Sequence, residues 1–217
     1  MIKQKKSWWI LVIVSIGVMV PFMYPYLTFD PDKSRVNITS TAIQYPVLVA
    51  HIIFAFIAIV TGFFQFIDSI RHRHPKIHRN IGRMYVISIF ISGIFAFVLF
   101  FYTESFTKAM AFLVLTVLWL FTTWKAYQAA VKRRFHEHRK WIIRSFGITL
   151  AAVNARLLVP FLLLGYTVFH TFTLPGGRDL MIDEVLNINI WAGLVLNMVI
   201  VEWVIIPKSK NPLKSNK

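Results

Sequence analysis

The sequence contains no cysteine and few acidic residues. Its 217 residues include no Cys and 9 Asp and Glu, against 24 Lys and Arg. Without thiols, disulfides, thiolate metal sites, iron–sulfur clusters and cysteine catalysis are all excluded. Gly-x-Ser-x-Gly and His-Glu-x-x-His strings, which mark two large classes of hydrolase, are also missing. A hydrolase is therefore a poor candidate, and any site has to be built from the remaining side chains.

Long apolar runs dominate the chain. Hydrophobic residues make up 57% of it, and its mean hydropathy is +0.61, whereas soluble domains are about 45–50% apolar. A run of about 20 apolar residues is long enough to cross a bilayer. Six such runs occur, at Trp8–Leu27, Tyr45–Ile67, Ile81–Tyr102, Met110–Val131, Trp141–Tyr166 and Leu186–Ile206. We therefore predict an all-α integral membrane bundle of six transmembrane helices, which forms one domain over residues 1–206.

The basic residues are divided among short segments between the apolar runs. If the N-terminus lies inside the cell, most of the 24 Lys and Arg residues fall on the cytoplasmic side and most acidic residues outside. Lys and Arg favour the cytoplasmic side of a membrane protein. We predict a multi-pass protein of the plasma membrane with both termini cytoplasmic and a basic tail at 207–217. The expected partner is the lipid bilayer; the pattern indicates no nucleic acid, and it identifies neither an oligomeric state nor an electron-transfer partner.

Three of the runs carry a stripe of small and polar residues that includes a His. Polar residues within a membrane span usually face the interior of the bundle, and spacings of three and four place residues on one helix face. The stripes are His51, Ala55, Ala58, Gly62 and Gln65; His78, Gly82, Tyr85, Ser92 and Ala96; and His138, Ser145, Thr149, Ala152 and Arg156. Small residues let membrane helices approach closely, so most of these positions indicate packing seams. The His residues and Arg156 need another explanation.

One group of polar residues is expected towards the outer side of the membrane. His51 lies near the start of a run that enters from outside. On a straight helix, which rises about 1.5 Å per residue, Arg156 would lie about 27 Å from His138 and thus also towards the outer side. We predict that His51, Asn154 and Arg156 line one outer-leaflet cavity, and that Pro160 bends the helix beyond them.

A second group is expected at the cytoplasmic ends of the runs. Its members are His78, Arg79, Arg83, His138, Arg139 and Arg144, and Gln65 and Asp68 reach the same level from the opposite direction. Glu202 reaches the same level near the end of the sixth run. Because a charge inside a membrane needs a partner, we expect Glu202 to form an ion pair with one of these Arg residues.

Two strings carry a likeness to a known family. "RHRHPKIHRNIGRMY" contains His-Arg-x-x-Gly-Arg-x-Tyr, and "HEHRKWIIRSFGITLAAVNARL" contains His-Arg-x-Trp-x-x-Arg. Together with "HIIFAFIAIVTGFFQF" and "LWLFTTWKAY", they resemble the bacterial membrane-protein family catalogued as domain of unknown function 2306. The family-like core spans residues 45–166. The resemblance implies a fold and a set of marked positions, with no established reaction: His51, His78, Arg79, Gly82, Arg83, Tyr85, His138, Arg139, Trp141, Arg144 and Arg156.

The leading functional hypothesis is a membrane redox or haem-handling protein linked to a b-type haem or a quinone. Imidazoles from two facing helices can hold a haem in a bundle. His78 and His138 lie at matching depths and are the candidate ligands of the haem iron, the only metal expected. Arg83, Arg144 or Arg156 would meet the propionates through charge-assisted hydrogen bonds.

Two alternatives remain open. The first is a transporter or binder of a small anionic or lipid-like ligand. In it Arg156 contacts the anion and His51 is a proton-linked switch, while the cavity is lined by Asn154, Gln65 and Tyr85. The second is a non-catalytic membrane protein whose two His-Arg strings only anchor helices at the membrane interface.

Overall fold

The structure, a computed structural model, describes residues 6–207. Within that range the chain forms helices and connecting turns, and no strand. The elements in chain order are α1 (Lys6–Leu27), the 3-10 turn η1 (Pro31–Lys33), α2 (Gln44–Gln65), α3 (Asp68–Arg73), α4 (Pro75–Phe100), α5 (Phe106–Val131), α6 (Phe135–Thr149), α7 (Ala151–Phe169), α8 (Gly177–Val199) and the π-helix η2 (Ile200–Ile205).

Six helical segments of the described range are long and apolar enough to cross a membrane, with α8 and η2 together forming one of them. This confirms the predicted all-α fold with six candidate membrane-spanning segments. The division into a domain at 1–206 and a tail at 207–217 stays a prediction, because the tail beyond Pro207 lies outside the described residues.

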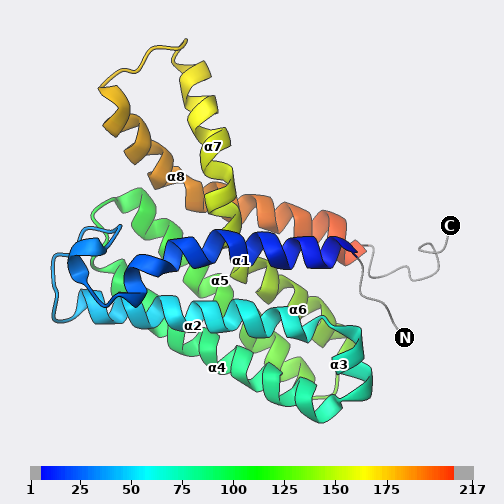
Figure 1. Ribbon diagram of the computed structural model, residues 1–217. Helices are drawn as coiled ribbons and strands as arrows, with labels where there is room; N and C mark the ends of the chain where they lie inside the picture. The colour runs from blue at the N-terminus through cyan, green and yellow to red at the C-terminus, as the bar shows by residue number, and fades with distance from the viewer. Residues whose placement is uncertain (1–5, 208–217) are drawn as a thin grey trace.

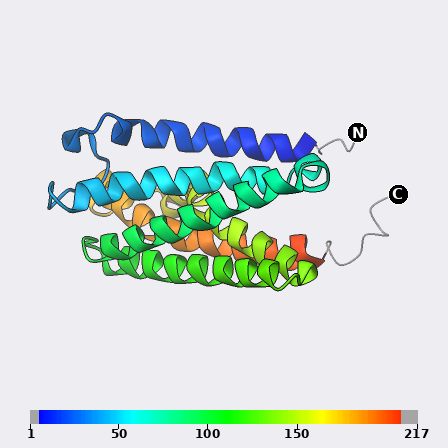
Figure 2. The same cartoon turned by 90° about the horizontal axis from the view of Figure 1, so that it is seen from below.

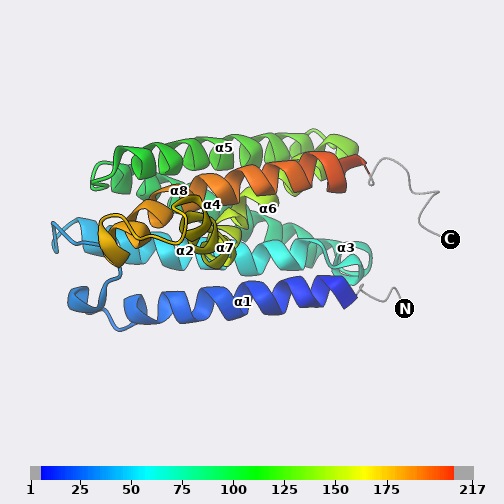
Figure 3. The same ribbon diagram turned by 90° about the horizontal axis from the view of Figure 1, so that it is seen from above.

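The helices α1, α2, α4, α5 and α6 lie alongside one another, together with the last part of α8 (Figures 1 and 2). α1 begins and η2 ends at the same end of the bundle. We call this the basic end, because it also holds α3 and the turn at 132–134. The opposite end is the loop end, which holds the 28–43 loop and the turn at 101–105. α7 and the first part of α8 lean out of the bundle, towards the viewer in Figure 3.

Small residues bring the helices together as the stripes predicted. The most extensive contacts are between α2 and α4, between α7 and α8, and between α5 and α6. Ala58, Ser92 and Ser145 have no exposed surface at all. At Gly62 of α2 an added Cβ would strike the ring of Phe146, so this position leaves no room for a side chain. The predicted packing seams are therefore confirmed.

The fifth apolar run differs from its prediction. It is not one straight helix, because the chain breaks at Leu150 into α6 and α7. The Thr149 hydroxyl donates to the carbonyl of Ser145 at 2.9 Å, and such bonds to the preceding turn bend helices. Pro160 lies well beyond the break, inside α7. The straight-helix distance from His138 to Arg156 is consequently wrong.

Candidate functional site

A guanidinium group without a charged partner lies between α7 and α1. The Cζ atom of Arg156 lies 3.6 Å from the centroid of the Phe22 ring. One of its terminal nitrogens donates to the carbonyl of Ala152 at 2.6 Å. Its Nε atom is buried and has no hydrogen-bond partner among residues 6–207, and no ion pair in that range includes Arg156. A buried cation is normally paired, so this one is a candidate ligand contact.

Two buried tyrosine hydroxyl groups lie in the same region. Tyr26 of α1 and Tyr45 of α2 belong to one apolar cluster and are 1% and 7% exposed. Neither hydroxyl has a hydrogen-bond partner within the described chain. Tyr26 lies within electrostatic reach of both Arg156 and Tyr45. Because buried polar groups are nearly always hydrogen-bonded, these donors and the guanidinium would suit a ligand rich in acceptors.

His51 of α2 is held in this region by Ser92 of α4. Its Nδ1 atom lies 3.0 Å from the Ser92 carbonyl oxygen, and the Ser92 hydroxyl donates to the His51 carbonyl at 3.1 Å. The Ser92 hydroxyl oxygen also lies 3.0 Å from Nδ1. Because the hydroxyl proton goes to the His51 carbonyl and a carbonyl only accepts, the arrangement that satisfies all three contacts has Nδ1 as donor and leaves Nε2 out of this contact. His51 also lies within electrostatic reach of Arg156. The structure therefore brings these two predicted residues into one region.

Asn154 does not join them. Its side-chain amide donates to Asn197 of α8 at 3.0 Å, and Asn197 in turn donates to the carbonyl of Gly193 at 3.0 Å. Residues two apart on a helix point to different sides, so Asn154 faces α8 while Arg156 faces α1. In this structure Asn154 fastens α7 to α8.

Sequence reasoning missed Phe22, Tyr26 and Tyr45. The first apolar run carries no His and no charge, so none of its side chains was a candidate. The available signal was weak: Phe22 and Tyr26 are four residues apart, on one face of α1.

The two histidines at the basic end face the interior through different contacts. The Nδ1 atom of His138 lies 2.9 Å from the carbonyl oxygen of Ala126. Nδ1 therefore donates to that carbonyl, and Nε2 takes no part in this contact. The Nδ1 atom of His78 is buried and has no partner among residues 6–207. The two side chains lie within electrostatic reach of each other. Both side chains lie at the basic end, on α4 and α6, and their joint role as haem ligands stays a prediction.

The space inward of this pair is filled by protein. The Gln65 amide donates to the carbonyl of His78 at 3.2 Å. An added Cβ at Gly82 would lie 3.2 Å from the Gln65 side-chain oxygen. Two turns further in, Tyr85 bridges α4 to α6 and is fully buried. A haem lying between His78 and His138 would have to displace these groups, so the residues present do not fit it.

Tyr85 belongs to a network of buried hydroxyl groups, which we call the hydroxyl network. Its hydroxyl lies 2.8 Å from that of Ser145 and 3.0 Å from that of Thr149. Thr123 of α5 lies 2.7 Å from Ser145, and the indole of Trp119 donates to Thr149 at 2.8 Å. Tyr85, predicted to line a ligand cavity, has its hydroxyl committed to neighbours in α6.

Arg144 is committed to an ion pair. Its Nε and a terminal nitrogen donate to the two carboxylate oxygens of Glu202 at 2.5 and 2.9 Å. Its Cζ atom also lies 4.8 Å from the centroid of the Trp141 ring. The expected pairing of Glu202 with an Arg of this group is therefore confirmed. Arg83, by contrast, is exposed on the surface of α4.

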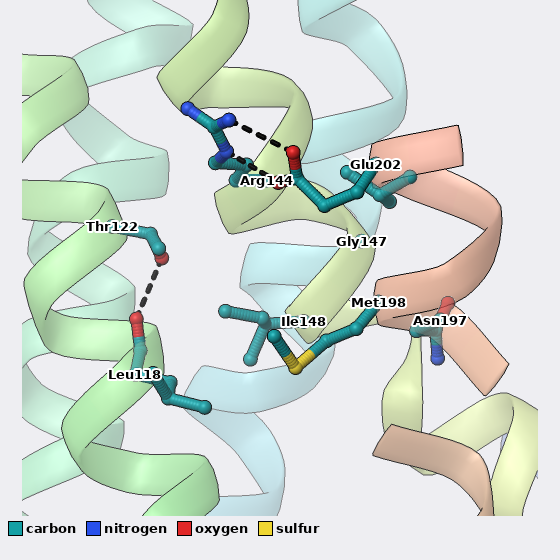
Figure 4. A pocket seen from close by; sticks show the side chains of 9 residues that line it. Leu118, Thr122, Arg144, Gly147, Ile148, Asn197, Met198 and Glu202 are labelled. Carbon is teal, nitrogen blue, oxygen red and sulfur yellow. Dashed lines mark hydrogen bonds and ion pairs between the residues drawn. The ribbon is translucent and has the colours of Figure 1, made fainter. Parts of the chain in front are cut away.

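A small cavity lies beside the Arg144–Glu202 pair, between α5, α6 and α8 (Figure 4). Its volume is about 60 Å³, which accommodates a few water molecules. Ligand sites usually measure about 300–1,000 Å³. This cavity is too small for a cofactor, and the ion pair beside it holds α6 against η2.

Comparisons with known proteins point to one family. No curated protein and no solved structure matches the chain. A family model described as "Predicted membrane protein (DUF2306)" matches residues 48–205. The matched region holds His51, Arg156 and both His-Arg strings, while Phe22 and Tyr26 precede it. Since the match covers more than half of the sequence, the chain belongs to the DUF2306 family of predicted membrane proteins.

Proposed function

We propose that the protein binds the anionic group of a lipid-like ligand at the loop-end site formed by Arg156, Phe22, Tyr26 and His51. The observation that carries this proposal is the guanidinium of Arg156, which lies on the Phe22 ring without a carboxylate partner in the described chain. An ionisable residue inside a membrane segment is expensive and marks a functional site by default. An anion would supply the missing charge together with charge-assisted hydrogen bonds.

The surroundings of Arg156 favour an amphipathic ligand. The next residue, Leu157, is 39% exposed, and Phe161 one turn later is 69% exposed. A ligand that reaches Arg156 along α7 therefore meets apolar side chains before the charge. The unpartnered hydroxyl of Tyr26 adds a donor beside the guanidinium. An acidic head group on an apolar tail matches this order of contacts.

A haem- or quinone-linked redox role ranks behind ligand binding. Its only specific support is the unpartnered Nδ1 atom of His78 close to His138. Gln65 and Tyr85 occupy the space inward of the two rings. Of the three Arg residues considered for the propionates, Arg144 is paired with Glu202 and Arg83 is exposed.

Replacement of Arg156 by Gln is expected to abolish stabilisation by anionic amphiphiles. At a ligand concentration about ten times Kd, binding stabilises a folded protein by about 1.4 kcal/mol. For a chain of this size that is about 3–6 °C in Tm. We expect dodecyl phosphate or dodecanoate to raise the Tm of the purified wild-type protein by this amount, and Arg156→Gln to lose the increase.

Arg178→Gln is the matched control, because it removes an equal charge from an exposed position in the first turn of α8. Its amphiphile-dependent Tm increase should equal that of the wild type. Arg156→Lys retains the charge without the planar guanidinium, and should retain part of the increase. If Arg156→Gln keeps the full increase, Arg156 is not the anion contact and the proposal fails.

A further inference from the structure

A second guanidinium lies on the same aromatic ring. Arg35 belongs to the 28–43 loop, far from Arg156 in the sequence. Its Cζ atom lies 5.5 Å from the Phe22 centroid, and a terminal nitrogen donates to the carbonyl of Pro21 at 3.3 Å. Arg35 and Arg156 lie within electrostatic reach of each other. Two positive charges therefore converge on Phe22 from different elements.

No acidic side chain of the described range neutralises this pair of charges. Asp30 of the loop lies 3.2 Å from the ammonium of Lys33. Asp32 lines the same cavity as Arg35, but no ion pair among residues 6–207 joins them. Like charges this close repel each other, so an anion between Arg35 and Arg156 would remove a repulsion as well as add two attractions.

A cavity in the 28–43 loop, which we call the loop cavity, opens beside Arg35 at the loop end. Its volume is about 350 Å³, and Arg35 is one of its lining residues. Most of the other lining side chains are polar, among them Ser34, Asn37 and Thr41. Arg35 lines this cavity and also lies on Phe22, so it borders both the cavity and the region of Arg156. A volume of this size is within the usual range for small-molecule sites.

We propose that the anionic group bound at this site is a phosphate ester, held between Arg35 and Arg156 with the Tyr26 hydroxyl as a further donor. This rests on the proposed function and names the ligand class. A carboxylate has one charge and two oxygens, which a single guanidinium satisfies. A phosphate monoester carries a charge of about −1.5 to −2 at neutral pH and three acceptor oxygens. Two guanidinium groups and a hydroxyl match the second set, and the planar fork of Arg suits phosphate geometry.

The same phosphate chemistry has two sources, a lipid head group entering from the bilayer and a soluble phosphate ester entering through the loop cavity. Three probes separate them at pH 7.4: dodecyl phosphate, dodecanoate with the same tail, and glycerol 3-phosphate without one. We expect dodecyl phosphate to bind the purified full-length protein about tenfold more tightly than dodecanoate, because loss of one charge-assisted contact typically costs about that factor. If glycerol 3-phosphate binds, the ligand is a soluble phosphate ester and the lipid-like part of the proposed function fails. If it does not bind, the ligand is a lipid with a phosphate head group. Either result keeps the phosphate assignment.

Arg35→Gln tests the role of the second guanidinium. The substitution should raise the Kd for dodecyl phosphate about tenfold and change the Kd for dodecanoate by no more than about twofold. Arg178→Gln is again the matched control, since it removes an equal charge from an exposed side chain that forms no ion pair within residues 6–207. Both positions are exposed, and the Tm without ligand checks that each variant folds. Equal affinity for the two amphiphiles, with neither sensitive to Arg35→Gln, would overturn the phosphate inference. If binding of both amphiphiles still depended on Arg156, the proposed function would stand without the phosphate inference. If binding did not depend on Arg156 either, the proposed function and the phosphate inference would both fail.

Discussion

Gly193→Ala is expected to lower the stability of the protein by about 3 kcal/mol, the upper part of the range for overpacked sites. Gly193 lies where α8 crosses α7. An added Cβ would be 2.8 Å from the carbonyl oxygen of Ala151 and 2.8 Å from the backbone nitrogen of Ala155. These are backbone atoms, so no side-chain rotation relieves the clash and the helices must separate. For a chain of this size the loss corresponds to about 6–12 °C in Tm, measured by circular dichroism of the purified protein.

Gly165→Ala is the matched control for this substitution. Gly165 also lies in α7, and no atom lies within 4 Å of the position its Cβ would take. Alanine is the better helix former by about 1 kcal/mol, so this variant should melt at or above the wild-type temperature. If Gly193→Ala melts together with Gly165→Ala, α7 and α8 are not in close contact at this crossing.

The same crossing positions the ligand site. The backbone of Ala155, which contacts Gly193, adjoins Arg156 in α7. A shift of α7 away from α8 would move the guanidinium relative to Phe22 of α1. Gly193→Ala should therefore also weaken amphiphile binding, although its side chain touches no ligand, because small displacements of positioning groups are costly. The hydrogen bond between Asn154 and Asn197 fastens the same two helices.

The sequence predicts well those features that depend on the local spacing of residues. Ala58, Ser92 and Ser145 are buried as their stripes require, because helical periodicity determines which face a residue occupies. Glu202 pairs with Arg144 because a charge in an apolar segment needs a partner, and few were available at that level. His51 and Arg156 were identified as candidates by the same reasoning.

The features that sequence reasoning missed depend on contacts between distant segments. No Pro marks the break at Leu150, and Gly147 lies three residues before it. The bend accompanies a hydrogen bond of Thr149 and lies where Gly193 of α8 packs against α7. α7 leans out from the bundle (Figure 1), and Arg156 near its start lies on the ring of Phe22 in α1. Its meeting with Phe22 and Arg35 could not follow from periodicity, since the two lie in a separate helix and an irregular loop.

Tyr85→Phe is expected to destabilise the protein by about 2 kcal/mol through the hydroxyl network. One arrangement of protons satisfies every contact: Thr123 donates to Ser145, Ser145 to Tyr85, and Tyr85 to Thr149, whose own proton goes to the Ser145 carbonyl. Removal of the Tyr85 oxygen leaves the Ser145 proton without an acceptor in the dry interior. The expected decrease in Tm is about 4–8 °C. Tyr127→Phe, which removes a hydroxyl from a residue that is 42% exposed, should change stability by less than about 0.5 kcal/mol.

The network also predicts how Tyr85 and Thr123 are coupled. Thr123→Val removes the donor at the start of the chain of hydroxyl groups, so once the chain is broken by Tyr85→Phe the second substitution should cost less. In a double-mutant cycle we expect a coupling of at least about 0.5 kcal/mol. Additive losses would show that the two hydroxyl groups act independently. Dodecyl phosphate should raise the Tm of Tyr85→Phe as much as that of the wild type, because the Tyr85 hydroxyl is fully used inside the bundle. A selective loss of that increase would instead place Tyr85 in the ligand cavity, as the sequence suggested.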